Sequence, residues 1–537
     1  MSRENLKTGL DVWLAELATA GKVVAKRELR TPLELMQNFF WKRICRNVSI
    51  PPDVGRCFSA AAVTALALLA TGCQTYQHQN KVVFYWRAGD LDRAAVEAEK
   101  EADRNAGGKD AIIWHLEEGA VLRGVGRFQD SNNAFDLAQD KMDDYARKAK
   151  VSISREAGAL LSNQANLPYE GRAYDGIMLN TYEALNYLEL GEPDKARPEL
   201  IRAYQRQQDA VQDNRRRIEK TQQEADASKD KASIERSEQD PTFQAAIQNS
   251  LPAINDASAY ANYVNPFTVY LDGLFFLADA TGSSDLERAH KSFERVLDFD
   301  GPDEYIHRSL ALVNDRMNGK PLSPTTFVIF ETGCAPVRDQ IRIDMPVFAA
   351  NVYYVGAAFP VLRVRDNFQP FLTVVANGES YPTRTIASMD SIIVCDFKNE
   401  LPAIITKTVA STITKAAASI AVDQAANNQN GIAGLLVSVA TTAYQISVNI
   451  ADTRTWTTLP KEFQICCFPT PPDHKVEVCT PTGARTVISL SQPTGASNPS
   501  PSAAQSRAFN ADNYLNVVYV KSISVGTPLR ITEFMMK

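Results

Sequence analysis

The sequence predicts an α+β protein in which a helical-repeat domain, an α-solenoid of the tetratricopeptide (TPR-like) type, precedes a β-rich domain. Small and aromatic residues recur at helical spacing through residues 81–320, and after Pro321 the pattern changes to short segments rich in β-branched residues. The 45% hydrophobic and 22% charged shares are typical of folded chains. Because 537 residues exceed one ordinary core, we expect two or three domains.

An apolar segment at residues 57–70 follows Arg56 and leads through small residues to Cys73, an order typical of a secretory signal peptide. The segment is shorter than the ~20 residues that a membrane-spanning helix requires. Residues 69–73, L-A-T-G-C, resemble a bacterial lipobox, with Ala70 where leucine is usual. That resemblance implies lipidation of Cys73 and cleavage before it, and Gln74 in the next position implies sorting to the outer membrane. A core cysteine on a buried helix is the alternative.

We interpret residues 1–72 as a signal peptide with an N-terminal extension, and residues 73–80 as a lipidated tether. Signal peptides normally occupy about 15–30 residues, which is much less than the sequence before Cys73. One interpretation is a true start at Met36, because Lys42, Arg43 and Arg46 would then supply the basic region. The other is a genuine extension with a short amphipathic helix near residues 10–17.

Residues 81–320 are expected to form TPR-like helix pairs. The best copy, residues 111–145, places the following residues at the motif spacing: Gly119, Leu122, Gly126, Phe128, Phe135 and Ala138. Further copies are expected near residues 85–94, 187–203 and 273–296. These residues pack paired helices together, so their role is structural. We predict that a partner binds the concave surface of the stacked helices. The polar segment 204–240 is interpreted as a solvated helix, because its acidic residues neutralise the three arginines at 215–217.

Residues 325–537 are expected to form a β-rich domain, a sandwich or half-barrel. The predicted strands are residues 325–330, 341–346, 360–365, 371–375, 391–396, 462–467, 475–479, 486–490, 515–522 and 528–534. An Ala/Ser/Thr-rich insertion at about residues 403–450 predicts a helical hairpin. Its uncharged second half contains several Ser, Thr, Gln and Asn side chains that are costly in lipid, so packing on the sheet is favoured over membrane insertion.

No catalytic or metal site is recognised. The five histidines, His78, His115, His290, His307 and His474, join no catalytic constellation, and motifs for nucleophiles, metals or phosphates are missing. We therefore expect no enzymatic activity, no cofactor and no metal. The late cysteines, Cys334, Cys395, Cys466, Cys467 and Cys479, allow at most two disulfides among themselves. A bond from Cys395 or Cys479 to the vicinal pair is favoured over a metal site, and a buried unreactive thiol is the alternative.

The segment A-D-T-R-T-W contains Asp452, Arg454 and Trp456, the polar-aromatic cluster most suggestive of an interaction site. A structural salt bridge that fixes the helical insertion against the sheet is the favoured interpretation, since an acid and a base two residues apart often organise the entrance to a strand.

Three stretches carry a family resemblance: E-T-G-C-A-P-V-R-D-Q-I-R-I-D-M-P from residue 331, A-D-T-R-T-W-T-T-L-P-K-E-F-Q-I from residue 451, and V-Y-V-K-S from residue 518. From Cys73 to the C-terminus the chain resembles an uncharacterised family of bacterial tetratricopeptide-type lipoproteins. The resemblance implies no enzymatic activity and a location in the cell envelope, in some members in a peptidoglycan-synthesis context.

The favoured hypothesis is a non-enzymatic scaffold anchored in the outer membrane and facing the periplasm. Its partner would be another envelope protein, such as a component of cell-wall synthesis or secretion, and oligomerisation stays open. The formal net charge of −6 provides no basic face for nucleic acid. One alternative is an envelope hydrolase or transferase using Asp452, Arg454 and His474. Another is an oligomeric assembly that inserts the Ala/Ser-rich hairpin into a membrane.

Overall fold

The computed structural model describes residues 74–151, 164–251, 264–301, 303–348, 352–427, 450–492 and 514–536. The chain divides into two units, Met1–Leu68 and Leu69–Lys537, and every described residue belongs to the second. The predicted signal segment and Cys73 therefore lie outside the described residues. Residues 74–80, expected as a tether, begin the first described helix. Among the described helices none is long and apolar enough to cross a membrane.

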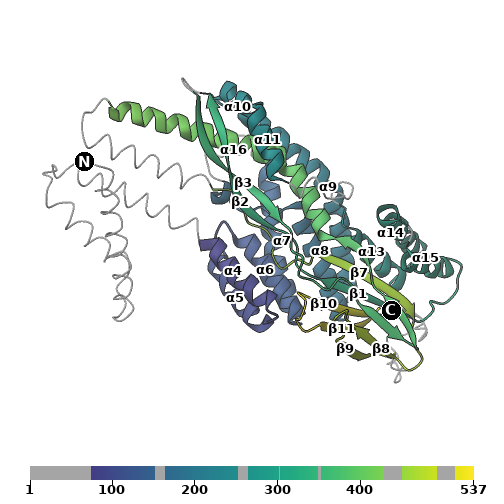
Figure 1. The fold of residues 1–537 in the computed structure, drawn as a ribbon. Helices are drawn as coiled ribbons and strands as arrows, with labels where there is room; N and C mark the ends of the chain where they lie inside the picture. The colour runs from purple at the N-terminus through teal and green to yellow at the C-terminus, as the bar shows by residue number, and fades with distance from the viewer. Residues whose placement is uncertain are drawn as a thin grey trace, which may run out of the picture. The chain divides into compact units, whose positions relative to one another are not determined.

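The predicted α+β class is confirmed, with helices first and sheets after them (Figure 1). The helices before the first strand are α4 (Gln74–Arg87), α5 (Leu91–Asn105), α6 (Ala111–Gly124), α7 (Phe128–Val151), α8 (Ala173–Glu189), α9 (Pro193–Asp226), α10 (Lys231–Glu238), α11 (Pro241–Ser250), α13 (Pro266–Ala278), α14 (Ser283–Asp300) and α15 (Glu304–Met317). The polar segment predicted as a solvated helix is mostly the second half of α9.

Helices pack in successive pairs, α4 with α5, α6 with α7, α8 with α9, and α13 with α14. Three glycines within the expected repeat copies, Gly89, Gly126 and Gly191, lie at turns between paired helices with φ of 76°, 83° and 72°, a conformation that glycine adopts without strain. Two others allow close approach of helices. A Cβ on Gly119 would overlap the Phe135 ring, and one on Gly273 would lie 2.9 Å from Phe293.

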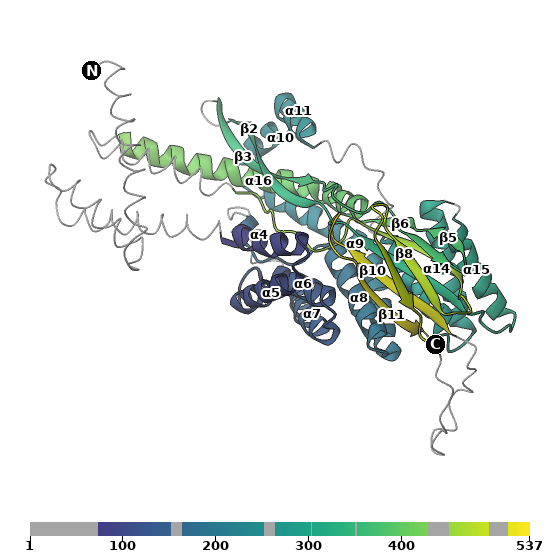
Figure 2. The ribbon, with the colours of Figure 1, turned by 60° about the horizontal axis from the view of Figure 1, so that its bottom comes forward.

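The inner helices α6, α8 and α13 are buried on nearly every side. Their partners α7, α9 and α14 cover one face, and the strands cover the other, so that α8 lies beside β11 (Figure 2) and α13 contacts β6. The stacked rings of Phe267 on α13 and Phe463 on β7, with centroids 3.9 Å apart, mark this contact. The inner surface that the sequence analysis assigned to a partner is therefore occupied by the chain's own sheet.

The described strands form three sheets. The five-stranded sheet has the order β11 (Arg530–Met536), β10 (Leu515–Ser522), β1 (Thr325–Thr332), β7 (Glu462–Pro469) and β6 (Arg384–Ser388), in which β1 runs parallel to β10 and antiparallel to β7. A four-stranded sheet has the order β5 (Glu379–Pro382), β4 (Thr373–Ala376), β8 (Lys475–Cys479) and β9 (Arg485–Ser489). Strands β2 (Val337–Phe348) and β3 (Val352–Arg363) form a long ribbon.

One strand prediction is wrong. Residues 391–396 belong to helix α16 (Met389–Asn427), which starts well before the helix expected near residue 403. The β-branched run suggested a strand, but the Ser391 N–H donates to Ser388 Oγ at 3.2 Å and Ile393 and Phe397, one turn apart, are both fully buried. Tertiary packing therefore overrides local β propensity. The second half of the predicted hairpin, residues 428–449, lies outside the described residues.

Glu400 on α16 joins four elements through ion pairs. Its carboxylate accepts from Arg172 before α8 at 2.8 Å, from Arg217 on α9 at 2.9 Å and from Arg338 on β2 at 2.8 Å. Burial alone would raise the pKa of Glu400, but the three guanidinium groups hold it well below its usual range. In neighbouring Asp396, burial and the Glu400 charge raise the pKa instead. One carboxylate thus forms ion pairs with three arginines.

We expect Glu400→Gln to lower the free energy of unfolding by about 3–5 kcal/mol, because it leaves buried arginines without their counter-charge. The carboxylate's contribution is present above the unfolded-state pKa of about 4.3 and is lost as pH falls towards the lower folded-state value. Urea unfolding of the wild type and the variant from about pH 3 to pH 7 would measure this contribution.

Asp396→Asn is the matched control in the same cluster. Because the pKa of Asp396 is raised, its ionisation opposes folding as pH rises above about 3.9, and its replacement should preserve stability at neutral pH. Equal destabilisation by both variants would contradict the central role of Glu400.

Candidate functional site

The predicted cluster around Arg454 is a buried clamp. Arg454 Nε donates to Asp452 Oδ1 at 2.8 Å and Nη2 donates to Asp452 Oδ2 at 2.9 Å, as the sequence suggested. Its Nη1 also donates to Asp110 Oδ1 at 2.9 Å and to the Leu167 carbonyl at 2.8 Å, both in the helical region. Burial favours protonation of Asp452, but Arg454 keeps its pKa below the usual range. The cluster therefore fastens the segment before β7 to the helices.

Trp456 anchors the same segment in the core. Its side chain is fully buried, with ring centroids 5.8 Å from Phe135 and 5.9 Å from Tyr182. Beside it, the buried Glu117 carboxylate on α6 accepts from the backbone and hydroxyl of Thr457 at 2.7 and 2.6 Å, and from the Thr458 hydroxyl at 2.7 Å. The segment from Asp452 to Thr458 is therefore held along most of its length, and the side chains described here make structural bonds.

The other side chains considered for chemistry are dispersed. His474 occupies the turn before β8, where its backbone N–H donates to Pro471 at 2.9 Å and its carbonyl accepts from Leu490 at 2.8 Å. Among the described residues, no group of three or more His, Cys, Asp or Glu side chains has the geometry of a metal site.

The disulfide favoured by the sequence analysis is not formed: among the described cysteines, Cys334, Cys395, Cys466, Cys467 and Cys479, none is joined to another by a disulfide. Cys466 and Cys467 are consecutive residues of the interior strand β7, so their side chains point to opposite faces of the sheet. Each is buried against a different layer, and Cys467 Sγ lies 3.6 Å from the Tyr305 carbonyl.

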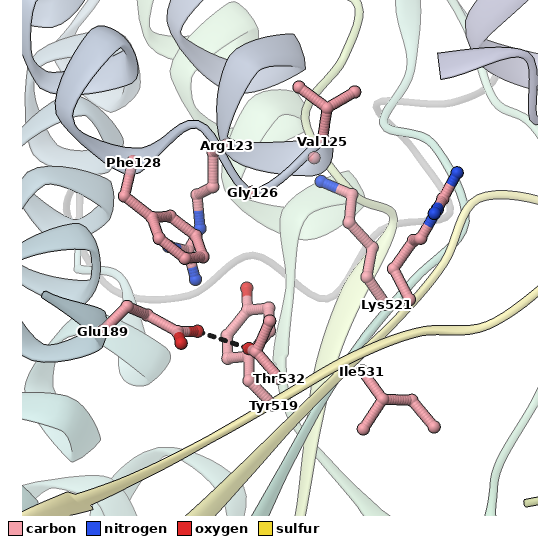
Figure 3. Close-up of a pocket in the computed structure, with 11 residues that line it drawn as sticks. Arg123, Val125, Gly126, Phe128, Glu189, Tyr519, Lys521, Ile531 and Thr532 are labelled. Atoms are coloured by element: carbon pink, nitrogen blue, oxygen red, sulfur yellow. Dashed lines mark hydrogen bonds between the residues drawn. The ribbon is translucent and has the colours of Figure 1, made fainter. Parts of the chain in front are cut away.

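A small cavity lies where the C-terminal ends of α6 and α8 meet β10 and β11 (Figure 3). Its volume is about 190 Å³, and its lining combines basic and aromatic side chains with one carboxylate. The lining residues are Arg123, Gly124, Val125, Gly126, Phe128, Glu189, Tyr519, Lys521, Arg530, Ile531 and Thr532. In Figure 3, Arg123 and Phe128 extend from the helical side towards Tyr519 and Thr532 on the strands.

Arg123 is buried and charged at this cavity. Only 5% of the residue is exposed, and its Nη1 donates to Asn186 Oδ1 at 2.6 Å. Its guanidinium carbon lies 4.6 Å from the centre of the Tyr519 ring. Burial alone would lower the pKa of Arg123, but Tyr519 and the carboxylates of Glu189 and Glu331 raise it. Among the described residues Arg123 has no salt-bridge partner, an unusual condition for a buried guanidinium.

Lys521 is buried beside Arg123 and has a counter-ion. Its Nζ lies 2.6 Å from Glu331 Oε1 on β1. Glu331 also accepts hydrogen bonds from the hydroxyls of Tyr182, at 3.0 Å, and Tyr519. Burial lowers the pKa of Lys521, although Glu331 opposes this change. The Lys521–Glu331 pair is thus internally neutral.

The remaining polar groups of the cavity are Glu189, Thr532 and Arg530. Thr532 Oγ1 donates to Glu189 Oε1 at 2.5 Å, the bond drawn in Figure 3. Burial raises the pKa of Glu189 despite the nearby Arg123 charge. Arg530 is exposed, and no ion pair of it is found within the described ranges.

Sequence reasoning missed this cavity although it touched two of its residues. Tyr519 and Lys521 belong to the quoted V-Y-V-K-S stretch, whose role was left unassigned, and Arg123 stands inside the best predicted repeat. The available signal was the charged Arg123 directly after the apolar run A-V-L at residues 120–122. Helix α6 and strand β10 are far apart in the sequence, so only the tertiary fold brings their side chains together.

Comparisons of the chain with protein-family models, with curated proteins and with solved structures find no match. The assignment of function therefore depends on the residues and the geometry above.

We expect Arg454→Lys to lower the free energy of unfolding by about 2–4 kcal/mol, because an ammonium group cannot reproduce the forked bonds to Asp452, Asp110 and Leu167. Urea unfolding would measure the loss, and hydrogen exchange should show faster exchange at residues 450–458.

Arg384→Lys is the surface control. Arg384 is about half exposed and pairs with Glu304 at 3.1 Å, so its replacement should change stability by less than about 0.5 kcal/mol. Equal effects of the two substitutions would refute the clamp.

Proposed function

We propose that this chain is a lipoprotein anchored through Cys73 in the bacterial outer membrane and facing the periplasm. There it acts as a non-enzymatic scaffold for another envelope protein, such as a component of cell-wall synthesis or secretion. The anchor is supported by the order of a basic residue, an apolar segment and the L-A-T-G-C stretch. Because α4 begins at Gln74, directly after Cys73, such an anchor would hold the folded body close to the membrane surface.

The scaffold role is carried by one observation: buried charged side chains, among them Asp452 and Arg454 of the enzyme alternative, bind the helical region to the β-rich region. Arg454 and Asp452 bind each other and Asp110, Glu117 binds Thr457 and Thr458, and Glu400 binds arginines from both regions. Of the residues named for the hydrolase or transferase alternative, Asp452 and Arg454 are thus engaged in structural bonds, and His474 lies in a separate turn before β8. This supports a rigid binding body over an enzyme.

Within this proposal the helix pairs are TPR-like units whose inner face is occupied by the sheet. The partner surface then lies on the outer helices. Leu137 on α7 is 50% exposed, and Ile201 and Tyr204 on α9 are each 43% exposed. Ile201 and Tyr204 are three residues apart, so they share a helix face. The centre of the Tyr204 ring also lies 5.4 Å from the guanidinium carbon of Arg288. This surface therefore combines apolar and cationic groups.

Intact-mass analysis of membrane-extracted protein tests the anchor. We expect the wild type to begin at Cys73 with acyl chains attached, and Cys73→Ser to lose both the acyl mass and the cleavage, because the thiol is the acceptor. Cys57→Ser, in the apolar segment, is the matched control and should remain lipidated. An unlipidated wild-type chain that retains residues 1–72 would overturn the proposed localisation.

Photo-crosslinking in living cells tests the scaffold role. A photoreactive residue at position 137 or 204 should form an adduct with an envelope protein, because these positions lie on the proposed partner surface. The control position is Val487 on β9, which is 65% exposed and should give no such adduct. Identical adducts from all three positions, or adducts at Val487 alone, would contradict the assigned surface.

A further inference from the structure

We infer that the cavity between α6, α8, β10 and β11 binds an oxyanion, the carboxylate or phosphate group of a small ligand, through Arg123, Lys521 and Arg530. This inference is independent of the scaffold role and of the lipid anchor. It rests on the charge of the lining, the bonding of Arg123 and the size of the cavity.

The charge of the lining favours an anion. Three basic side chains and one carboxylate, Glu189, face the cavity. Counting also Glu331, which pairs with Lys521, these three basic and two acidic side chains sum to one positive charge. Glu189 is bonded to Thr532, and Glu533 on β11 lies near enough to raise its pKa together with burial. An anion in the cavity would complete the balance.

Arg123 is the residue that most requires such a ligand. A buried guanidinium is ordinarily stabilised by a carboxylate or phosphate in forked geometry. Here the hydrogen-bond partners are the amide of Asn186 and the side chain of Tyr519, and the rings of Phe128, Tyr182 and Tyr519 lie 4.6–5.6 Å from the guanidinium carbon. The carboxylates of Glu189 and Glu331 act on Arg123 through their charge without forming an ion pair with it. These rings hold the flat group in place without neutralising it. The site is thus preorganised for a planar or tetrahedral oxyanion.

Strand pairing places the other two cations together. Lys521 on β10 and Arg530 on β11 are directly opposite in the antiparallel register, so both side chains start at the same end of the sheet. Lys521 is buried at the inner part of the cavity, whereas Arg530 is exposed and accessible to an arriving ligand. One buried arginine, one buried lysine and one exposed arginine therefore surround the same space.

The volume limits the ligand. About 190 Å³ is smaller than the ~300–1,000 Å³ of sites for drug-sized molecules, and it corresponds to roughly six waters at ~30 Å³ each. The cavity accordingly accepts a small free anion or the charged end of a larger molecule. Inorganic phosphate and succinate represent the two oxyanion chemistries.

Titration calorimetry with phosphate and with succinate, at constant ionic strength in chloride buffer, tests the inference. We expect saturable binding of at least one anion in the micromolar to millimolar range and a matching rise in melting temperature. Binding of phosphate alone would identify a phosphate-type ligand, and binding of succinate alone a carboxylate. Absence of saturable binding of both anions at millimolar concentration would overturn the proposal.

Variants locate the site. Arg530→Gln removes an exposed charge, so the protein should fold normally while its affinity falls about tenfold. Arg123→Gln should abolish binding. Arg215→Gln, an exposed arginine on α9, is the matched control and should bind as the wild type does. Unchanged affinity in Arg530→Gln, or an equal loss in Arg215→Gln, would show that binding occurs elsewhere and would refute the site.

Discussion

The placement of Glu400 is the constraint on which much of this architecture depends. Its single carboxylate is shared by arginines that precede α8, belong to α9 and belong to β2. Arg172 and Arg338 are almost fully buried, and burial of a guanidinium is costly unless a counter-charge compensates its lost hydration. The helices, the ribbon and α16 therefore require one another at this position. The charge network sets the relative register of elements that hydrophobic contact alone would specify loosely.

Hydrophobic contacts also join the helical region to the β-rich region. The described apolar side chains form one continuous cluster from Val82 on α4 to Met536 on β11, so the helical and β-rich regions share a core. Helices α6, α8 and α13 form its middle layer. Such helices need apolar residues around most of their circumference, and α13, P-F-T-V-Y-L-D-G-L-F-F-L-A, has that composition. The sheet thus replaces the solvent that an isolated solenoid would have on its inner side.

Local features of the fold could be predicted from the sequence, whereas features made by distant residues could not. Glycine turns, the small-aromatic pair of Gly119 and Phe135 and the Asp452–Arg454 pair depend on residues close in the chain or on a repeated pattern. The Arg172–Glu400 pair joins residues 228 positions apart, and the oxyanion cavity combines three helical elements with two C-terminal strands. Residues 391–396 were misassigned because β-branched side chains favour strands locally, while the finished core requires a helix there.

The parallel pairing of β1 with β10 also determines how the chain can be made. Thr325 lies beside Leu515, so the first strand of the central sheet lacks this neighbour until residues 515–522 have been synthesised. Contacts of such long sequence separation form slowly. A ribosome-bound or partly translocated chain would meanwhile present β1 as an apolar, hydrogen-bonding edge, the kind of surface that promotes aggregation. The strand order therefore makes β1 an unpaired edge during synthesis, until its late-coming neighbours are available.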